Sequence, residues 1–188
     1  MYSMANYHHG NLHTELLENA RGLLEESSAA ISIREVARRT GVSHAAAAHH
    51  FTDKRGLLTA LAAAGFRSLA QCLASAGDDF LEAAVQYVRF ATTNPGLYSL
   101  MFDPKAVDGA AVELAEARAE AGRLLHTGVG TVLDESARLD PEAAALASLA
   151  LVHGFSTLLI TGYLNVSDSP DAMTRRLGRM LFANVTTS

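Results

Sequence analysis

Apolar residues recur at helical spacing along most of the chain. The first predicted helix runs from Asn11 to about Glu26. Its apolar stripe consists of Leu12, Leu16, Leu17, Ala20, Leu23 and Leu24. A long helix predicted after Asp53 carries the same kind of stripe. Because no segment alternates apolar and polar residues as a strand would, the pattern predicts about eight to ten helices and no sheet.

Capping residues predict two short helices joined by a tight turn between residues 32 and 51. Ser32 and Glu35 match a capping box, in which each side chain satisfies a free N–H group at the helix start. Gly41 is typical of a left-handed helix exit, and Ser43 is the next N-cap. This arrangement is a helix-turn-helix candidate, although helix pairs of this shape also occur without DNA binding.

Proline marks further predicted helix starts, because proline in the first helical position loses no hydrogen bond. A capping residue precedes the proline in each of the pairs Asn94-Pro95, Asp103-Pro104, Asp140-Pro141 and Ser169-Pro170. Helical spacing also covers residues 79–93 and 109–137. The helix that starts at Pro141 is predicted to reach Leu164.

Composition agrees with a helical globular protein. The chain is 49% apolar and 19% charged, has 6% aromatic residues and contains no Trp. A single cysteine, Cys72, excludes an intramolecular disulfide and a cysteine-based zinc site. No basic segment with an apolar run follows Met1, so we expect a cytoplasmic protein.

Charge divides the chain into two unlike parts. Residues 1–67 hold seven Lys or Arg against six acidic residues, whereas residues 68–188 hold eight against fourteen. Lys54 and Arg55 lie in the first turn of one predicted helix and Arg34 in that of another, where the helix dipole disfavours a cation. A bound phosphate would explain these cations, and the alternative is that they are solvated surface charges. This asymmetry suggests two functions in one chain.

A long uncharged segment raises the possibility of a membrane helix. Residues 143–167 contain no Asp, Glu, Lys or Arg and are long enough to span a bilayer. The segment nevertheless includes polar residues such as His153 and Asn165, and no basic flank marks a cytoplasmic side. A helix buried between other helices, or one in an interface, fits this pattern better.

Motifs for catalysis and metal binding are weak. The pair Gly128 and Gly130 lacks the third glycine of a dinucleotide fingerprint, and Ser156 lacks the setting of a nucleophile elbow. His9 and His13 stand four residues apart, but no carboxylate has matching spacing. We therefore expect no catalytic residue, no metal and no cofactor.

Several short motifs resemble one regulator family when they are taken together. They are Tyr7-His8-His9-Gly10-Asn11-Leu12, Ile33-Arg34-Glu35-Val36-Ala37, Gly41-Val42-Ser43, His49-His50-Phe51-Thr52-Asp53-Lys54 and Leu57-Leu58. The combination, within residues 7–69, resembles the signature of the TetR family of transcriptional repressors. The resemblance implies an all-α homodimer with an N-terminal helix-turn-helix DNA-binding domain of three helices and a C-terminal helical-bundle domain for ligand binding and dimerisation. The domains are expected at residues 1–55 and 77–188, with a connecting helix at 56–76.

The resemblance also implies which residues contact DNA. The family's contact positions correspond here to Ser32, Arg34, Ser43, His44, Ala45, Ala46, His49, His50 and Lys54. Ala47 and Phe51 are expected to face the core of the small domain. Ala48 stands where the family usually has a phosphate-contacting Tyr, and the loss of that contact should weaken binding to all DNA sequences alike.

The C-terminal part carries a fainter resemblance. The segment Asn94–Phe102 resembles the one before the ligand pocket of many TetR-type regulators, and Val152-His153-Gly154 resembles the Trp-His-Gly element of one C-terminal subclass. Pocket candidates, most of which a bundle would use as core, are Tyr87, Phe90, Tyr98, Met101, Phe102, Leu125, His126, Val129, His153 and Phe155. Dimer-interface candidates are Ala147, Leu151, Gly154, Leu158, Gly162, Leu177, Met180 and Leu181.

The sequence thus predicts a transcriptional repressor that binds a palindromic operator as a homodimer. A small apolar or amphipathic ligand is expected to release it from the DNA, and no membrane partner is expected. The alternative is a helical-bundle ligand-binding protein, or an enzyme, whose first helices do not serve DNA binding. The charge asymmetry, with Arg34 and Lys54 at helix starts, favours the repressor because a pure ligand binder would not need it.

Overall fold

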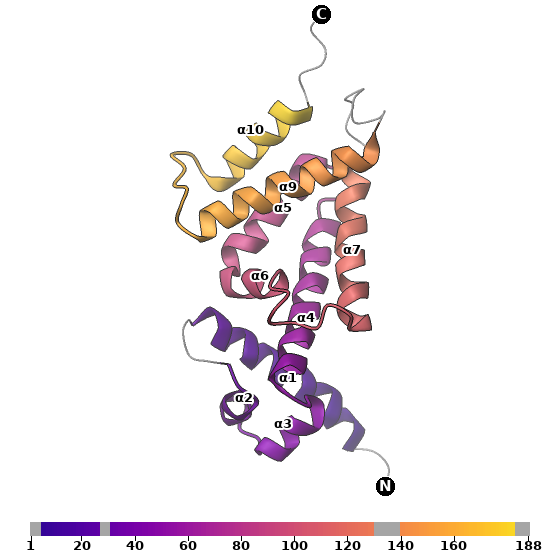
Figure 1. The fold of residues 1–188 in the computed structure, drawn as a ribbon, viewed down its shortest axis with the longest axis vertical. Coiled ribbons are helices and arrows are strands. Elements are labelled where there is room, and N and C mark those ends of the chain that lie inside the picture. Colours follow the sequence, from indigo (N-terminus) through magenta and orange to yellow (C-terminus); the bar gives the residue numbers. More distant parts are fainter. Residues whose placement is uncertain (1–4, 27–30, 130–139, 183–188) are drawn as a thin grey trace, which may run out of the picture. The chain divides into compact units, whose positions relative to one another are not determined.

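The computed structural model describes residues 5–26, 31–129 and 140–182 (Figure 1). These described residues form nine α-helices and no strand, which confirms the all-α prediction. The helices are α1 (Ala5–Glu25), α2 (Ile33–Thr40), α3 (His44–His50), α4 (Lys54–Ala74), α5 (Phe80–Thr93), α6 (Pro95–Met101), α7 (Val112–Val129), α9 (Pro141–Ile160) and α10 (Pro170–Phe182). They belong to two compact units, Met1–Gly65 with Gly96–Ala115 and Phe66–Pro95 with Glu116–Ser188.

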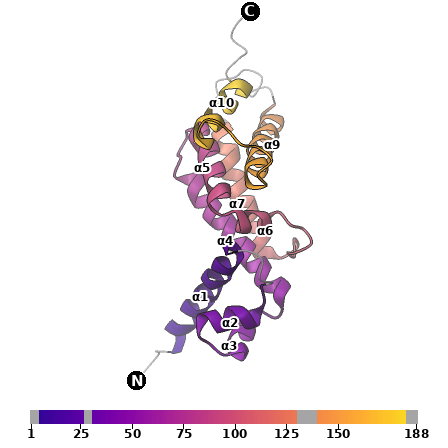
Figure 2. The same ribbon diagram turned by 90° about the vertical axis from the view of Figure 1, so that its left-hand side faces the viewer.

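The first unit contains a small core built by its N-terminal helices. In Figure 2, α2 lies beside α3, and α2 also packs against α1. Side chains from α1 to α4 that are almost fully buried include Leu16, Val36, Ala47, Phe51 and Leu57. The predicted inward orientation of Ala47 and Phe51 is therefore confirmed, with exposed fractions of 0% and 4%. This core fixes α3 with one face inward, so its other residues are left for the surface.

Helix α6 is attached to α1 within the first unit. Glu25, the last residue of α1, accepts hydrogen bonds from the backbone N–H groups of Gly96 at 3.0 Å and Leu97 at 2.9 Å. The carboxylate thereby satisfies free N–H groups at the start of α6. A Cβ atom at Gly96 would lie 2.7 Å from the carbonyl oxygen of Leu24, so only glycine permits this close approach of two backbones.

One of the predicted proline-initiated helices does not form. Pro95, Pro141 and Pro170 each begin a helix as expected, but Pro104 begins a turn, and the next helix starts at Val112. The prediction at Pro104 is wrong because hydrogen bonds with Asp103 and with residues of α4 hold this segment in turns. Asp103 accepts from the N–H of residue 105 at 2.9 Å, and the turn is then attached to α4.

The attachment to α4 involves two polar contacts at the end of the turn. Arg55 donates to the carbonyl oxygen of Val107 at 3.1 Å, and the N–H of Asp108 donates to the hydroxyl of Thr59 at 2.9 Å. Val107 itself is buried, with an exposed fraction of 1%. These tertiary contacts replace the helical hydrogen bonds that the Asp-Pro pair alone would favour.

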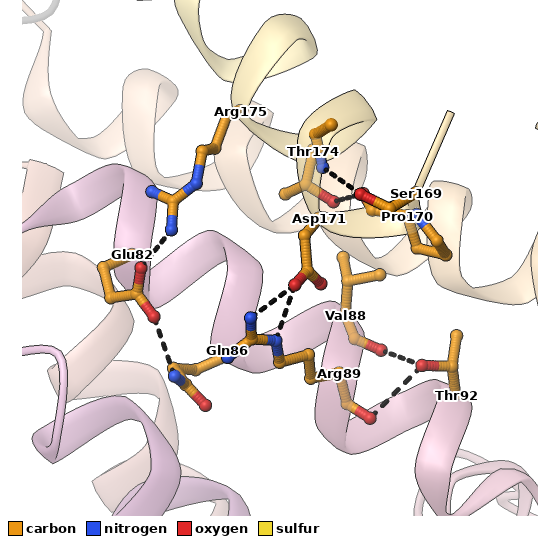
Figure 3. Close-up of polar contacts among 11 residues, drawn as sticks. Glu82, Gln86, Val88, Arg89, Thr92, Ser169, Pro170, Asp171, Thr174 and Arg175 are labelled. Carbon is orange, nitrogen blue, oxygen red and sulfur yellow. Dashed lines mark hydrogen bonds and ion pairs between the residues drawn. The ribbon is translucent and has the colours of Figure 1, made fainter. Parts of the chain in front are cut away.

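In the second unit, α5 is the central helix and packs against both α9 and α10. Its buried side chains include Val85, Tyr87 and Val88. Two ion pairs connect the outer face of α5 to α10, and Figure 3 shows both. Arg89 donates to Asp171 through Nε at 2.8 Å, and Arg175 pairs with Glu82, which also accepts from Gln86 at 2.8 Å.

Helix α9 is shorter than predicted. It ends at Ile160 instead of Leu164, and Gly162 follows in the left-handed region with φ of 69°. The predicted extension is wrong because a glycine in that conformation terminates the helix. Gly162, one of the dimer-interface candidates, therefore lies beyond α9.

Two described helices, α4 and α9, are long and apolar enough to cross a membrane by length and composition alone. The most apolar window of α4 is 61% buried and that of α9 is 33% buried. Core helices of soluble proteins meet the same criterion, so this property is weak evidence for a membrane span. Because α9 is apolar and only partly buried, it has an exposed apolar surface. This surface includes Leu146 and Leu158, with exposed fractions of 66% and 40%.

Candidate nucleic-acid interface

The helix-turn-helix forms from the capping residues that the sequence indicates. Ser32 is the N-cap of α2 and accepts from the N–H of Glu35 at 3.2 Å. Gly41 ends α2 with φ of 77°, and Ser43 caps α3 by accepting from the N–H of Ala46 at 3.1 Å. Both serine hydroxyls act as acceptors inside the fold, so their hydrogens are still available to donate to a phosphate oxygen.

Helix α3 presents small residues and histidines to the surface. Ser43, His44, Ala45 and His49 are exposed, and Ala46 is half-buried. His50 is also half-buried, because its ring lies beside those of His13 and Phe51, with centroid separations of 5.8 Å and 6.4 Å. The exposed face is thus narrow and able to enter a groove closely, with His44 and His49 as its hydrogen-bonding side chains.

Basic residues near this face differ in whether they are neutralised. Arg38 makes two hydrogen bonds to Glu35, at 2.9 Å and 2.6 Å, and Arg39 pairs with Glu26. These contacts hold the pKa of both carboxyl groups below the ordinary value, through the guanidinium hydrogen bonds. The two arginines are therefore paired within the protein.

Arg34 and Lys54 are the contrasting pair of cations. Arg34 is the second residue of α2 and Lys54 the first residue of α4, and both are exposed. Within the described part of the chain, neither side chain has an ion-pair partner or a hydrogen bond. Each lies at the positive end of its helix dipole, which disfavours a cation unless an anion binds there. The predicted first-turn positions of both cations are confirmed.

Ala48 is half-buried and lies in the C-terminal half of α3. Its methyl group reaches little beyond the backbone, so this position has no long side chain with which to contact a phosphate. All nine predicted DNA-contact residues lie on α2, α3, their N-caps or the first residue of α4. All nine belong to the first unit, whereas their contacts with DNA stay a prediction.

The predicted pocket residues fall into two separate units. Tyr98, Met101 and Phe102 belong to the first unit, where Tyr98 and Met101 are buried and Phe102 is 38% exposed. The others belong to the second unit. His126 is exposed there, with Nδ1 at 2.7 Å from the carbonyl oxygen of Gly122. Val129 is the last residue of α7, and its side chain lies outside the described residues.

Two pocket candidates of the second unit meet directly. The hydroxyl of Tyr87 on α5 lies 3.4 Å from Nδ1 of His153 on α9. Burial lowers the pKa of the His153 imidazole, because it disfavours the charged form. The candidates Phe90, Leu125 and Phe155 are all buried in this unit.

Ser156 is a further residue of this region that the pocket candidates did not include. Its hydroxyl is buried and has no hydrogen-bond partner among the described residues. It stands three positions after His153, and this spacing is the sequence signal that could have identified it.

The predicted dimer residues lie mostly on exposed or half-exposed surfaces. On α9, Ala147 and Leu158 are exposed, whereas Leu151 and Gly154 are half-buried. On α10, Met180 is 62% exposed and Leu177 is half-buried. The side chain of Leu181 lies outside the described residues.

Comparison with protein families assigns both parts of the chain. Residues 16–61 match the family model of bacterial regulatory proteins of the tetR family. Residues 80–181 match the tetracyclin repressor-like C-terminal domain. The chain belongs to the TetR family of transcriptional regulators. Its helix-turn-helix is accordingly the DNA-binding element of a TetR-family protein.

Individual relatives agree with the TetR assignment. The HTH-type transcriptional repressor AcnR of Corynebacterium diphtheriae is 28% identical over 144 residues, which cover 64% of this chain and 76% of that protein. A protein of unknown function from Rhodococcus sp. RHA1 has 32% identity and a TM-score of 0.75, with 95% of this chain and 96% of that chain covered. The TetR family transcriptional regulator PfmR from Thermus thermophilus shares the fold, with 18% identity, coverage of 93% and 97%, and a TM-score of 0.61.

Proposed function

We propose that this TetR-family protein is a repressor that binds a palindromic operator as a homodimer and is released by a small molecule. The supporting observation is the pair of exposed cations, Arg34 and Lys54, which lie in the first turns of α2 and α4 without an ion-pair partner among the described residues. A surface of this kind suits a polyanion, because the negative potential of DNA offsets an unfavourable cation at a helix start, whether that cation contacts a phosphate or a base edge. The repressor AcnR is similar in sequence, which supports the direction of regulation.

The proposed contacts divide into base readout and phosphate binding. Arg34 and His44 reach base edges in the major groove, where guanidinium and imidazole groups discriminate between bases. Ser32, His49 and Lys54 hold phosphates and set the register. Ala45 and Ala46 permit close approach of the helix and can contact thymine methyl groups. Ser43 and His50 complete the contact surface at its edges.

The proposed homodimer uses the apolar surfaces of α9 and α10. Leu158 and Met180 are exposed there, with exposed fractions of 40% and 62%. Pairing of these helices with a second copy would bury them in a two-fold interface. A two-fold dimer matches a palindromic operator, because it repeats the recognition helix at a fixed spacing along the DNA. In this proposal the regulator acts in the cytoplasm and has no catalytic function.

The test is footprinting on DNA from the promoter region of the protein's own gene. We expect wild-type protein to protect a palindromic site and the double variant Arg34→Ala/Lys54→Ala to lose that protection. Lys105→Ala/Arg118→Ala is the matched control, because both side chains are exposed outside α2, α3, α9 and α10 and their removal changes the charge by the same amount. Failure of the wild-type protein to protect any site would instead favour the alternative of a ligand-binding protein or an enzyme without DNA binding.

A further inference from the structure

Ser156 has a buried hydroxyl that the rest of the described structure does not use. Its residue is 0% exposed, and its oxygen has no hydrogen-bond partner among the described residues. Ser148, two turns earlier on the same helix, is also buried but donates to the carbonyl oxygen of Ala144 at 2.7 Å. A buried hydroxyl without a partner is unfavourable, so Ser156 requires an explanation that Ser148 does not.

Helix α9, which carries Ser156, packs against α5, and the two helices bring buried aromatic side chains and a few hydrogen-bonding groups into this unit. His153 stands three residues earlier and therefore on the same side of α9, and its Nδ1 lies 3.4 Å from the hydroxyl of Tyr87. The neighbouring residue Phe155 is buried, as is Phe90 on α5. Tyrosine, histidine and serine can all exchange hydrogen bonds with an oxygen atom placed between α5 and α9.

On α5 and α9, the charged side chains are directed elsewhere. Helix α9 carries none after Glu142, and Glu82 and Arg89 on α5 form ion pairs with Arg175 and Asp171 on α10 (Figure 3). Burial lowers the pKa of His153, so its imidazole is neutral near pH 7. An anionic ligand would therefore lose its hydration here without gaining a cation, which is strongly unfavourable.

We propose that Ser156, with Tyr87 and His153, binds the oxygen of an uncharged and predominantly apolar ligand of the alcohol class. This inference rests on the proposed function, in which a small molecule releases the repressor from DNA, and it names the chemistry of that molecule. The ligand's hydroxyl pairs with the Ser156 hydroxyl, and its hydrocarbon part lies among the apolar side chains of α5 and α9.

The test compares an alcohol with the acid of equal chain length. Binding of 1-octanol and of octanoate to the full chain is measured by isothermal titration calorimetry at pH 7.5. We expect 1-octanol to bind with a Kd at least about tenfold lower than that of octanoate, because the carboxylate must be buried without a counter-ion. Equal or tighter binding of octanoate, or no binding of 1-octanol, would overturn the proposal.

A pair of serine variants tests the role of the hydroxyl itself. Ser156→Ala should raise the Kd of 1-octanol about three- to tenfold, the effect of one neutral hydrogen bond. Ser148→Ala should leave that Kd within about twofold, because the Ser148 hydroxyl is bonded within its own helix. An unchanged Kd in Ser156→Ala contradicts the assignment. Ligand-free Ser156→Ala should unfold at or above the wild-type temperature, and a lower temperature would show that the hydroxyl has an internal partner.

Operator binding by the ligand-free protein separates the two proposals. If the protein binds operator DNA but 1-octanol neither binds nor releases it, the ligand assignment fails and the repressor function stands. If no DNA is bound while 1-octanol binds through Ser156, the repressor function fails and the ligand site stands.

Discussion

At the scale of single residues, whether a basic side chain is available for DNA depends on its partner in the fold more than on its residue type. Arg34 and Arg38 occupy the same helix, yet Arg38 is bound to Glu35 and Arg34 has no ion-pair partner within the described residues. Lys54 and Arg55 are adjacent, yet Arg55 donates to the carbonyl oxygen of Val107. The cations available for DNA are therefore those that the fold leaves without a partner.

Lys54→Ala should weaken binding to every DNA sequence by a similar factor, because a phosphate contact carries no base information. The slope of log Kd against log salt concentration should become shallower by about 1, since one counter-ion fewer is released. Fluorescence anisotropy at several salt concentrations measures this slope, with Lys105→Ala, an exposed residue outside α2, α3, α9 and α10, as the control of equal charge. An unchanged slope in Lys54→Ala would show that Lys54 does not contact a phosphate.

Ala48→Tyr should strengthen binding to operator and to random duplex DNA by a similar factor. The added phenol restores a hydroxyl at a position where Ala48 has only a methyl group, and a phosphate contact acts on all sequences alike. Parallel titrations of the two DNA molecules measure the effect. Weaker binding would mean that α3 lies too close to the groove floor for a larger side chain.

At the scale of elements, carboxylates attach one helix to another in both units. Glu25 joins α1 to the start of α6, and Glu82 joins α5 to α10. The hydrogen bond from Arg175 is the main cause that lowers the pKa of Glu82, and the bond from Gln86 adds to it. A pKa lowered by folding links the stability of the folded state to pH.

The sign of this linkage follows from the direction of the shift. Because the pKa of Glu82 is lower in the folded state than in the unfolded chain, its contribution is fully present above the ordinary glutamate pKa. The contribution is lost as the pH falls through the folded-state pKa. Acid should therefore loosen the connection between α5 and α10.

Glu82→Gln should lower the free energy of unfolding by about 0.3–1 kcal/mol near pH 7, a small value because solvent partly screens the pair. The difference from wild type should shrink as the pH is lowered from about 6 to about 3. Urea unfolding at several pH values measures it. Glu116→Gln, at an exposed position of α7, is the matched control and should show no such difference.

At the scale of the whole molecule, exposed apolar residues on α9 and α10 indicate a partner surface. Leu146, Leu158 and Met180 have exposed fractions of 66%, 40% and 62%. Large apolar side chains with this exposure are costly in water and are typical of association surfaces. A second copy of the chain is the occupant that the proposed operator binding requires.

The double variant Leu158→Glu/Met180→Glu should sediment as a monomer, whereas the wild type sediments as a dimer at micromolar concentration. Buried glutamates would be desolvated in the interface, so the dimer should dissociate while the first unit stays folded. Operator affinity should fall sharply, because a monomer contacts only a half-site. Val112→Glu is the control and should remain dimeric. Val112 is an apolar residue of the first unit, and its exposed fraction is 69%. A wild-type monomer would refute the dimer.

The sequence by itself determined the features that depend on local chemistry. Caps such as Ser32, Ser43 and Asp140 and the left-handed exit at Gly41 follow from hydrogen bonds within a few residues. The helical class follows from the period of apolar positions, and the combined motifs of the first residues identified the family. Local signals suffice for these features because the interactions that produce them are themselves local.

Only the tertiary structure decided the features that depend on residues distant in sequence. Pro104 begins a turn because Arg55 and Thr59 on α4 bind the following segment, which no local signal records. Arg34 and Lys54 differ from Arg39 because Glu26, thirteen positions before Arg39, lies within its reach. Ser156 has a buried hydroxyl with no partner among the described residues, whereas Ser148 on the same helix has one. In each case the deciding contact is made only after the chain folds, so its energy cannot be inferred from neighbouring residues.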